Sequence, residues 1–446
     1  MDVSHEFKGK KITLMGLGLL GRGVGDAEFL AECGADLLVT DLKNEEQLAE
    51  SLERLSRFPN ITYVLGEHRL EDFQSCDMVL KAAGVPLDSP YIAEAKKHHI
   101  PVEMSAALFA RLSGIPIIGV TGSRGKSTTT QLIYHTLTRA TEGGTVHLGG
   151  NVRGVSNLQL LKEVGEGDIA VMELDSWQLQ GFGDAGISPH IAVFTNLLPD
   201  HMNYYKGDME AYFDDKALIF ANQDAGDVFI TTPALFKEVE KYVARKKYAF
   251  LQEVVLTDAV EVPADWVLPI PGEHNQVNIA LAIEALRATS LSEEMIREGV
   301  ESFEALPGRL QYVGEAHGVK IYNDNNSTSP AATRAGLEAV SEERNVVLIM
   351  GGSDKGLDMR ELLEIIPEYA KDVVLLAGAG TDTVRHAFPN APLCASLKEA
   401  VDEAFSRAEA GDVILFSPAF ASFGMFKNEY ERNDLFMSLV QDHMNT

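Results

Sequence analysis

The residues with the clearest chemical potential are the glycines, lysine and hydroxyls of the segment 119–128, which reads GVTGSRGKST. The segment follows the apolar run Ile115–Thr121, so a buried strand would lead directly into a glycine loop. Backbone N–H groups of such a loop can surround phosphates at the start of a helix. The spacing is the short TGxxGKS form, since Val120 stands six positions before Lys126. The pattern predicts ATP binding, with phosphate or metal contacts from Gly122, Ser123, Gly125, Lys126, Ser127 and Thr128.

A second glycine pattern lies near the N-terminus, where Gly16, Gly18 and Gly21 form GxGxxG directly after an apolar strand. Asp41 follows twenty residues after Gly21, at the end of the next strand. Such glycines permit a tight turn and close approach of a diphosphate, and the acidic residue can hydrogen-bond a ribose hydroxyl. The motif alone favours a nucleotide, with NAD as one reading, and a glycine-rich turn without a ligand as the other.

Two further strand ends offer metal ligands. Glu173 ends the strand Asp168–Glu173, and Asp200-His201 follows the strand His190–Asn196. In a parallel sheet these ends lie at the same edge as the phosphate loop. A carboxylate and an imidazole could therefore meet Mg²⁺ there, although each residue taken singly is as well explained as a solvated loop residue.

The last third of the chain carries polar loops after further strands. Arg309, Asp324, Lys355 and the segment Ser417–Asn428 look like site loops, although each could be an ordinary polar loop. Upstream of them, Asn275-Gln-Val-Asn278 follows a Pro-Gly-Glu-His turn. We expect Asn275 to cap the helix Asn275–Ala288, with a second amide one turn later.

Alternating apolar runs and helical patterns must position these residues, which predicts an α/β fold with parallel βαβ units. The first hundred residues form one such unit, a second begins near Ser105, and the Ala305–Gly308 break opens a third. We therefore expect domains at 1–104, 105–306 and 307–446. The strands expected in addition to those named above are Lys11–Met15, Asp36–Thr40, Ile61–Leu65, Met78–Lys81, Val228–Thr232, Lys247–Phe250, Lys320–Asn323, Val346–Met350, Val373–Leu376 and Val413–Phe416.

The composition excludes several classes of protein. The chain has 446 residues and a formal net charge of −28, which argues against nucleic-acid binding because such a surface repels phosphate backbones. Its three cysteines lack metal-binding spacing and fit a reducing compartment. No apolar run is long enough to span a bilayer and the N-terminus lacks a signal-peptide pattern, so we expect a cytoplasmic protein without membrane insertion.

Taken together, the motifs resemble those of the Mur ligases. The segments that carry the resemblance are TGSRGKSTTT, ELDSWQL, TNLLPDHMNYY, GEHNQVN, GRLQYVG, YNDNNSTSP, GGSDKG and SPAFASFGMFKNEYER. They run over essentially the whole chain, and the opening GLGLLGRG and the SPAFAS ending are closest to the branch that adds glutamate. The resemblance implies three domains: an N-terminal Rossmann-like domain for a UDP substrate, a central P-loop ATPase-like domain and a C-terminal Rossmann-like domain.

The resemblance also implies roles for individual residues. In the N-terminal domain, Gly18, Leu19, Asp41 and Gly84 match positions that contact uridine and diphosphate, and Asn151 matches a substrate contact. Glu173 and His201 match Mg²⁺ ligands, and Lys216 matches a lysine whose carbamate would serve a second Mg²⁺. The positions matching contacts to ATP beyond the phosphate loop are Asn275, Asn278, Arg309 and Asp324, and those matching contacts to the amino acid are Thr328, Lys355, Ser422 and Phe423.

The implied reaction is the ATP-dependent addition of D-glutamate to UDP-N-acetylmuramoyl-L-alanine through an acyl phosphate, with two Mg²⁺ ions. The resemblance also implies a cytoplasmic monomer of the peptidoglycan pathway. Asn326 and Ser329 depart from the family pattern DSKATN, which reads DNNSTS here. Glu429 replaces the aromatic residue that usually follows FKN. These departures leave an L-glutamate-adding relative as an alternative. Asp175 is a further departure, which adds a carboxylate beside the expected metal site.

Three other functions remain open from the sequence. A nicotinamide-dependent oxidoreductase would explain GxGxxG and Asp41 but leaves the phosphate loop without a role. A non-catalytic nucleotide-binding partner in cell-wall synthesis would explain the altered amino-acid positions. Folate polyglutamylation occurs in the same superfamily, but the glycine-rich N-terminal domain argues against it.

Overall fold

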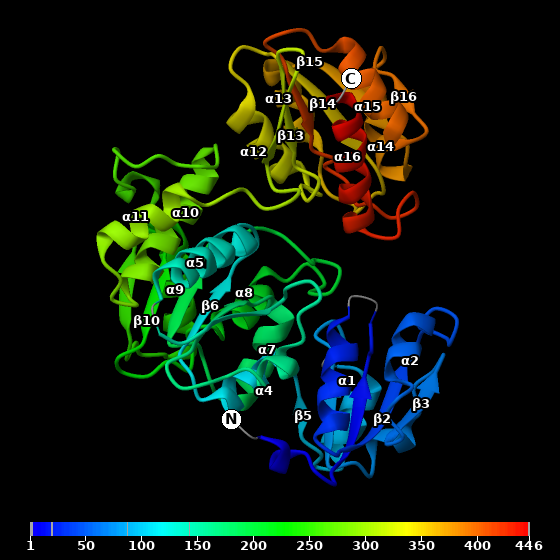
Figure 1. Ribbon diagram of the computed structural model, residues 1–446, viewed down its shortest axis with the longest axis vertical. Coiled ribbons are helices and arrows are strands. Elements are labelled where there is room, and N and C mark those ends of the chain that lie inside the picture. Colours follow the sequence, from blue (N-terminus) through cyan, green and yellow to red (C-terminus); the bar gives the residue numbers. More distant parts are fainter. Residues whose placement is uncertain (1–2, 19–20, 87, 142, 445–446) are drawn as a thin grey trace. The chain divides into compact units, whose positions relative to one another are not determined.

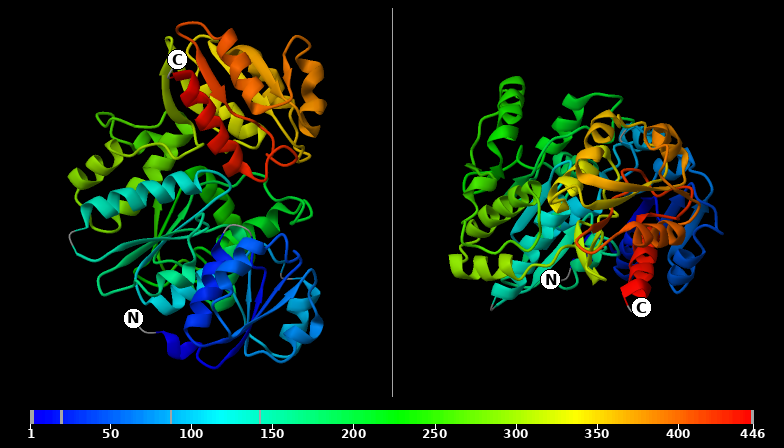
Figure 2. Two further views of the ribbon diagram at one scale, coloured as in Figure 1. Left: turned by 45° about the vertical axis from the view of Figure 1, so that its right-hand side comes forward. Right: turned by 90° about the horizontal axis from the view of Figure 1, so that it is seen from above.

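The computed structural model of the protein describes residues 3–18, 21–86, 88–141 and 143–444. These residues build three sheets, which follow one another along the chain (Figure 1). Figure 2 shows the same sheets from two further sides. Apolar runs of four to six residues form the central strands, because strands covered on both faces must be apolar throughout. Four short 3₁₀ helices lie at Ser4–Glu6, Leu70–Phe73, Ala259–Glu261 and Arg385–Ala387.

The first sheet is fully parallel, with the strand order β3-β2-β1-β4-β5. Its first strand leads into the glycine motif and then into α1, the helix that begins at Arg22. The strands are β1 (Lys11–Met15), β2 (Asp36–Asp41), β3 (Ile61–Leu65), β4 (Met78–Lys81) and β5 (Val102–Glu103), and the helices are α1 (Arg22–Glu32), α2 (Ala49–Leu55) and α3 (Pro90–Lys97).

The second sheet is also parallel, with the order β11-β10-β9-β6-β8-β7. Because β6, β8 and β9 are neighbours, the loops after them meet at one edge. The strands are β6 (Ile117–Thr121), β7 (Val146–Gly150), β8 (Ile169–Glu173), β9 (Ile191–Phe194), β10 (Val228–Thr231) and β11 (Glu253–Leu256). The helices are α4 (Ser105–Ser113), α5 (Lys126–Ala140), α6 (Asn157–Leu160), α7 (Ser176–Ala185), α8 (Met209–Ala217), α9 (Pro233–Lys246), α10 (Glu273–Arg287) and α11 (Glu293–Glu301).

The third sheet has the order β12-β13-β17-β14-β15-β16, and only its β12–β13 pair is antiparallel among the described strands. The last strand of the chain, β17, lies between β13 and β14, which brings three distant loops together. The strands are β12 (Gln311–Ala316), β13 (Val319–Asn323), β14 (Val346–Gly351), β15 (Ala370–Leu376), β16 (Leu393–Cys394) and β17 (Val413–Phe416). The helices are α12 (Pro330–Val340), α13 (Arg360–Tyr369), α14 (Ala379–Val384), α15 (Leu397–Arg407) and α16 (Glu429–Met444).

The chain forms two compact units. The first comprises Met1–Glu261 and Asn278–Gly299, and it holds the first two sheets, which share one large apolar cluster, with a smaller cluster on the first sheet. The second comprises Val262–Val277 and Val300–Thr446, and it holds the third sheet. The domain limits 1–104, 105–306 and 307–446 remain predictions, since each sheet falls within one of these ranges but nothing fixes their ends.

Two local expectations are wrong. No strand forms at Lys247–Phe250, because Lys247 ends α9 with a left-handed backbone (φ 53°) and the strand begins only at Glu253. Asn275 does not precede its helix, because α10 begins at Glu273. The Asn275 amide instead donates a hydrogen bond back to the Pro271 carbonyl (2.7 Å). Among the described residues, no helix is long and apolar enough to cross a membrane.

Candidate active site

The phosphate loop lies where the sequence predicts it, between β6 and α5. Gly122 (φ 146°) and Gly125 (φ 83°) adopt backbone conformations that favour glycine. A Cβ on Gly125 would lie 2.1 Å from the Asn278 amide oxygen, which places this α10 residue against the loop. Lys126 is the first residue of α5, so the loop ends at a helix N-terminus that favours anions.

Two lysines meet on one carbonyl of this loop. The Lys126 amine donates a hydrogen bond to the Gly122 carbonyl (3.0 Å), and the Lys216 amine donates to the same carbonyl (2.8 Å). Lys216 comes from α8 and its side chain is 1% exposed. Burial, and secondarily the nearby Lys126 cation, hold the pKa of Lys216 well below its ordinary value. Lys216 is therefore a buried amine whose surroundings favour the loss of its proton, next to the phosphate loop.

The loop that follows β9 supports the phosphate loop. The Thr195 hydroxyl donates to the Arg124 carbonyl (2.5 Å), and the Asn196 side chain accepts from the Arg124 N–H (2.9 Å). Ser123, predicted to contact ATP, has its hydroxyl engaged internally, since it donates to the Leu198 carbonyl (2.8 Å). The phosphate contacts of Ser123 would therefore come from its backbone. Sequence reasoning missed Thr195 and Asn196, whose signal is their position at the end of a strand beside the loop.

Glu173 fits a divalent cation. It ends β8 and is 7% exposed, and within the described ranges no group donates a hydrogen bond or forms an ion pair with its carboxylate. A buried carboxylate without a partner is costly, and a hard cation such as Mg²⁺ would remove that cost. The backbone holds it in position, because the Glu173 carbonyl accepts from the Asn151 N–H (2.7 Å). No group of three or more His, Cys, Asp and Glu side chains lies close enough together to form a complete metal site in this part of the chain.

His201 stands in a left-handed turn (φ 54°), with its ring 4.7 Å from that of Trp177. Burial lowers the pKa of His201 against the opposing effect of Asp200, which favours the neutral imidazole that a metal ligand needs. Asp200 itself pairs with Arg124 (2.7 Å). Burial would raise the pKa of Asp200, but Arg124 and His201 hold it below its ordinary value. Asp200 therefore stabilises the loop through its ion pair with Arg124, whereas His201 is available to contact a ligand.

A cavity of about 420 Å³ lies in the first unit beside these residues. It joins the glycine motif to the central site, because Gly18, Gly84, Lys126, Asn151 and His201 all line it. Asp41 is not among its lining residues. The Asp41 carboxylate accepts hydrogen bonds from the N–H groups of Leu17 (2.8 Å) and Gly18 (3.2 Å). It therefore stabilises the backbone of the glycine loop from outside the cavity. Leu19 lies outside the described residues.

The same cavity contains charged residues that the sequence did not single out. Arg22, the first residue of α1, lines the cavity and donates to the Asn151 side chain. Lys81 lines it as well and is buried at the end of β4, where burial lowers its pKa to about 8. The signal for Arg22 was its place directly after GxGxxG, at the start of a helix. Asp175, the departure beside the metal site, caps α7 in a capping box with Gln178.

A second cavity, in the second unit, collects most of the remaining predicted residues. It has a volume of about 320 Å³ and is lined by Arg309, Asn326, Thr328, Lys355, Ala421, Ser422, Phe423, Glu429 and Tyr430. We call it the C-terminal pocket. The Lys355 amine donates to the Thr328 hydroxyl (2.9 Å), which joins the loops after β13 and β14. Arg309, matched to ATP by resemblance, thus lies with the residues matched to the amino acid.

Asp324 is buried and directly follows β13 in the same unit. Its carboxylate accepts hydrogen bonds from the Ser417 hydroxyl (2.8 Å) and from the Leu310 N–H (3.1 Å). Burial raises the pKa of Asp324 to about 6, with these hydrogen bonds opposing the shift. Asp324 therefore joins the ends of β13 and β17, in addition to any contact with a ligand.

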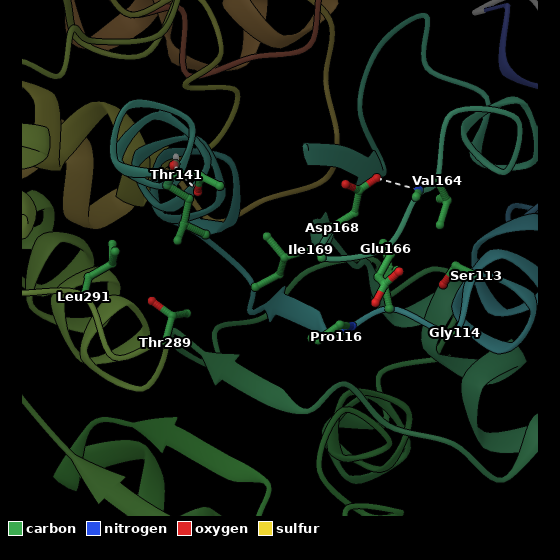
Figure 3. A pocket seen from close by; sticks show the side chains of 14 residues that line it. Ser113, Gly114, Pro116, Thr141, Val164, Glu166, Asp168, Ile169, Thr289 and Leu291 are labelled. Atoms are coloured by element: carbon green, nitrogen blue, oxygen red, sulfur yellow. Dashed lines mark hydrogen bonds between the residues drawn. The ribbon is translucent and has the colours of Figure 1, made fainter. Parts of the chain in front are cut away.

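A third cavity, of about 750 Å³, lies at the opposite edge of the second sheet, near Pro116 and Asp168 at the amino ends of β6 and β8 (Figure 3). Figure 3 shows Leu291, Thr289 and Thr141 on its other side. The Asp168 carboxylate is already engaged by the N–H groups of Thr145 (2.6 Å) and Gly165 (2.8 Å). No predicted site residue lines this cavity.

Comparison with known proteins identifies the fold and the family. The description "Mur ligase MurD-like, N-terminal domain" matches residues 10–103, "Mur ligase middle domain" matches 120–286, and "Mur ligase, glutamate ligase domain" matches 308–420. A UDP-N-acetylmuramoylalanine–D-glutamate ligase of Roseiflexus sp. (strain RS-1) is 35% identical and covers 98% of this chain and 99% of its own. The chain belongs to the Mur ligase family. The predicted resemblance, the three-domain α/β architecture and the class of enzyme, a ligase, are confirmed.

Other members of the Mur ligase family agree with this assignment. A relative of the same name from Borreliella burgdorferi (strain ZS7) is 33% identical over 98% of this chain and 99% of its own. Among solved structures, the UDP-N-acetylmuramate-alanine ligase of Thermotoga maritima has a TM-score of 0.60 at 20% identity, covering 97% of this chain and 99% of its own. A Mur ligase structure from Acinetobacter baumannii has a TM-score of 0.59 at 14% identity, covering 100% of this chain and 93% of its own. These two structures support the fold alone.

Proposed function

We propose that this Mur ligase joins D-glutamate to UDP-N-acetylmuramoyl-L-alanine and converts ATP to ADP and phosphate in cytoplasmic peptidoglycan precursor synthesis. The observation that carries the proposal is the convergence of the Lys126 and Lys216 amines on the Gly122 carbonyl in the loop after β6, with the unpartnered Glu173 at the end of the neighbouring strand β8. The relatives that match nearly the whole chain bear the name of this activity. A nicotinamide-dependent oxidoreductase would leave that convergence without a role.

The first step we propose is phosphoryl transfer. A carboxylate oxygen of the muramoyl-alanine attacks the γ-phosphorus, the bond from that phosphorus to ADP breaks, and an acyl phosphate forms. Lys126 and the N-terminus of α5 neutralise the phosphates so that two anions can approach. When bound, Mg²⁺ would stabilise negative charge on the transferring phosphate, held by Ser127, Glu173 and His201. Asn278 and Asn275 on α10, with Arg309 and Asp324, would hold the rest of the nucleotide.

The second step is amide formation. The glutamate amine attacks the acyl carbon, and the tetrahedral intermediate expels phosphate while the amine loses a proton to solvent. Thr328, Lys355, Ser422 and Phe423 would hold the glutamate in the C-terminal pocket. Gly18, Gly84, Arg22 and Asn151 would hold the UDP substrate in the cavity of the first unit, with Asp41 supporting the glycine loop and Leu19 as a further contact.

Lys216 fits the proposed carbamate. A neutral amine adds to CO₂ and releases a proton, which gives a negative group, and burial favours the neutral amine that this addition needs. The carbamate would place an anion beside the proposed metal ions, at a position where the amine has no carboxylate partner among the described residues. Two Mg²⁺ ions would then be held by Ser127, Glu173, His201 and carbamylated Lys216. A monomeric state remains part of the proposal.

The test is the release of ADP from ATP, with Mg²⁺ and UDP-N-acetylmuramoyl-L-alanine present and D-glutamate or L-glutamate supplied separately. We expect turnover with D-glutamate and a loss of about 10³-fold or more in Lys126→Ala, because one lysine neutralises the charge that develops in the transition state. Turnover with L-glutamate alone would assign the chain to the L-glutamate-adding reaction, which Asn326, Ser329 and Glu429 suggest. Nucleotide binding without ligation of either amino acid would support a non-catalytic role instead.

A further inference from the structure

The charges of the C-terminal pocket carry an inference that rests on the proposed function and deepens it. Of the described residues that line the pocket, Arg309 and Lys355 carry positive charges and Glu429 carries the one negative charge. Glutamate has the complementary arrangement, with two carboxylates and one ammonium group. Lys355 and its partner Thr328 suit a carboxylate, and so does the Ser422 hydroxyl. These residues leave the ammonium group without an assigned partner.

We propose that the Glu429 carboxylate binds the ammonium group of the incoming amino acid, and that Asn325 and Arg432 hold Glu429 in position. Glu429 is the first residue of α16 and is half-buried at the wall of the pocket. Across the described part of the chain, no donor hydrogen-bonds to its carboxylate and no cation lies within ion-pair distance of it, although buried Arg432 is near enough for the two charges to interact. The N-terminus of a helix stabilises a carboxylate only weakly, so it does not replace a counter-ion in the pocket.

The backbone of Glu429 is held by a hydrogen bond from the Asn325 side chain. The Asn325 amide donates to the Glu429 carbonyl (2.9 Å) and to the Asn326 side-chain oxygen (3.0 Å). Asn325 itself is fully buried, and its two hydrogen bonds are partly shielded from water. One side chain thus joins the loop after β13 to the start of α16.

Arg432 in turn fixes Asn325. Its guanidinium donates to the Asn325 side-chain oxygen (2.8 Å) and to the Asn325 carbonyl (2.8 Å), and the side chain is 0% exposed. Burial lowers the pKa of Arg432 to about 10, so it stays charged at pH 7, and Glu429 is the acidic group that favours this charge. The sequence departures Asn326 and Glu429 therefore meet in one buried network.

This arrangement bears on the hand of the amino acid. Two carboxylate sites and one ammonium site define three points, and only one enantiomer can fill all three in a given orientation. Removing the ammonium site leaves two points, which both enantiomers can satisfy. Glu429 would therefore determine both the affinity for glutamate and the preference between D and L forms.

The experiment compares wild type with Glu429→Gln in steady-state kinetics. We expect KM for D-glutamate to rise roughly 10-fold to 100-fold, as for loss of a charge-assisted hydrogen bond, with KM for ATP unchanged. Glu429→Asp should recover part of the affinity. Asp434→Asn, an exposed position on the same helix, removes one carboxylate outside the pocket and should leave the kinetics unchanged.

Inhibition by glutarate, which has both carboxylates and no amine, separates recognition from structural damage. Glutarate should inhibit Glu429→Gln at least as well as wild type. In wild type it has no ammonium group to neutralise the Glu429 carboxylate, and the substitution removes that negative charge. A damaged pocket would weaken glutarate and D-glutamate together, and that result would overturn the proposal. An unchanged KM for D-glutamate in Glu429→Gln would overturn it too. Wild type that lacks turnover with D-glutamate would instead contradict the proposed function itself.

Discussion

At the scale of single residues, the site uses buried groups whose charge is costly. Lys216, Glu173, Asp324 and Arg432 are all buried and charged or titratable, and none has an opposite charge bonded to it within the described ranges. Such groups reduce stability, so residues that retain them are candidates for function. Asp324 gives the clearest test, because its partners allow an isosteric replacement.

We expect Asp324→Asn to raise the free energy of unfolding above pH 6 while lowering activity. The pKa of Asp324 is about 6 in the folded protein against 3.8 in the ordinary carboxyl, so between these values the folded state binds more protons and stability falls as pH rises. Asparagine does not ionise, so the variant avoids this loss, which is about 3 kcal/mol of the free energy of unfolding. The oxygen of the asparagine side chain can still accept a hydrogen bond from the Leu310 N–H, and its NH₂ group can donate to the Ser417 hydroxyl. The Ser417 hydroxyl can in turn donate to the Thr333 hydroxyl (2.9 Å).

Urea unfolding at pH 4.5 and pH 7.5 measures the difference. The variant should gain clearly more stability relative to wild type at pH 7.5 than at pH 4.5, because most of the loss in wild type develops between these two pH values. A variant that is equally destabilised at both pH values would show that the shifted pKa of Asp324 does not contribute to stability.

At the scale of elements, the contact between α1 and α6 positions the N-terminal domain on the central one. The Ser156 hydroxyl donates to Asp26 (2.6 Å) and the Gln159 side chain donates to the Gly25 carbonyl (3.0 Å). A Cβ on Gly25 would lie only 2.5 Å from that of Ser156, so the two helices approach closely only because position 25 is glycine. Arg22, on the same helix, reaches Asn151 in the cavity.

We therefore expect Gly25→Val to raise KM for UDP-N-acetylmuramoyl-L-alanine by about 10-fold, since overpacking of about 1–3 kcal/mol must displace α1 from α6. KM for ATP should change little, because the phosphate loop lies on other elements. Gly143→Val is the matched control, since nothing lies within 4 Å of a Cβ there. Equal loss of affinity for both substrates in Gly25→Val would mean that the contact supports the whole unit rather than one domain.

The elements also show what the sequence could predict. The apolar strands β1, β4 and β17 have the predicted bounds, because burial on both faces leaves a plain apolar run, and the edge strand β3 also has the predicted bounds although it is partly exposed. The strand β7 (VHLGG) was missed, since its buried His147 pairs with Asp168 (2.7 Å) and interrupts that run. The C-terminal pocket could not be assembled from the sequence, because it depends on β17 lying between β13 and β14. Likewise, the network of Asn325 and Arg432 joins residues more than a hundred positions apart.

At the scale of the whole molecule, an acidic protein acts on acidic substrates. The chain has a formal net charge of −28, and the proposed substrates ATP, the UDP-sugar and glutamate are all anions. Local cations such as Arg22, Lys126 and Lys355 must attract them against the field of the remaining surface. The two effects differ in range, because the local cations act over a few ångströms and the net charge acts over the size of the molecule.

This difference in range predicts an unusual response to salt. The Debye length falls from about 30 Å at 0.01 M to about 8 Å at 0.15 M, so added salt screens the net charge of the molecule more than the contacts within a pocket. We expect kcat/KM for the UDP substrate to rise about 2-fold to 5-fold over this range, whereas enzymes with steering cations lose rate. Substituting sucrose for NaCl at equal osmolality controls for effects on stability. A fall in kcat/KM with salt would show instead that the pocket cations dominate the approach of the substrate, and Arg22→Ala should then abolish much of that dependence.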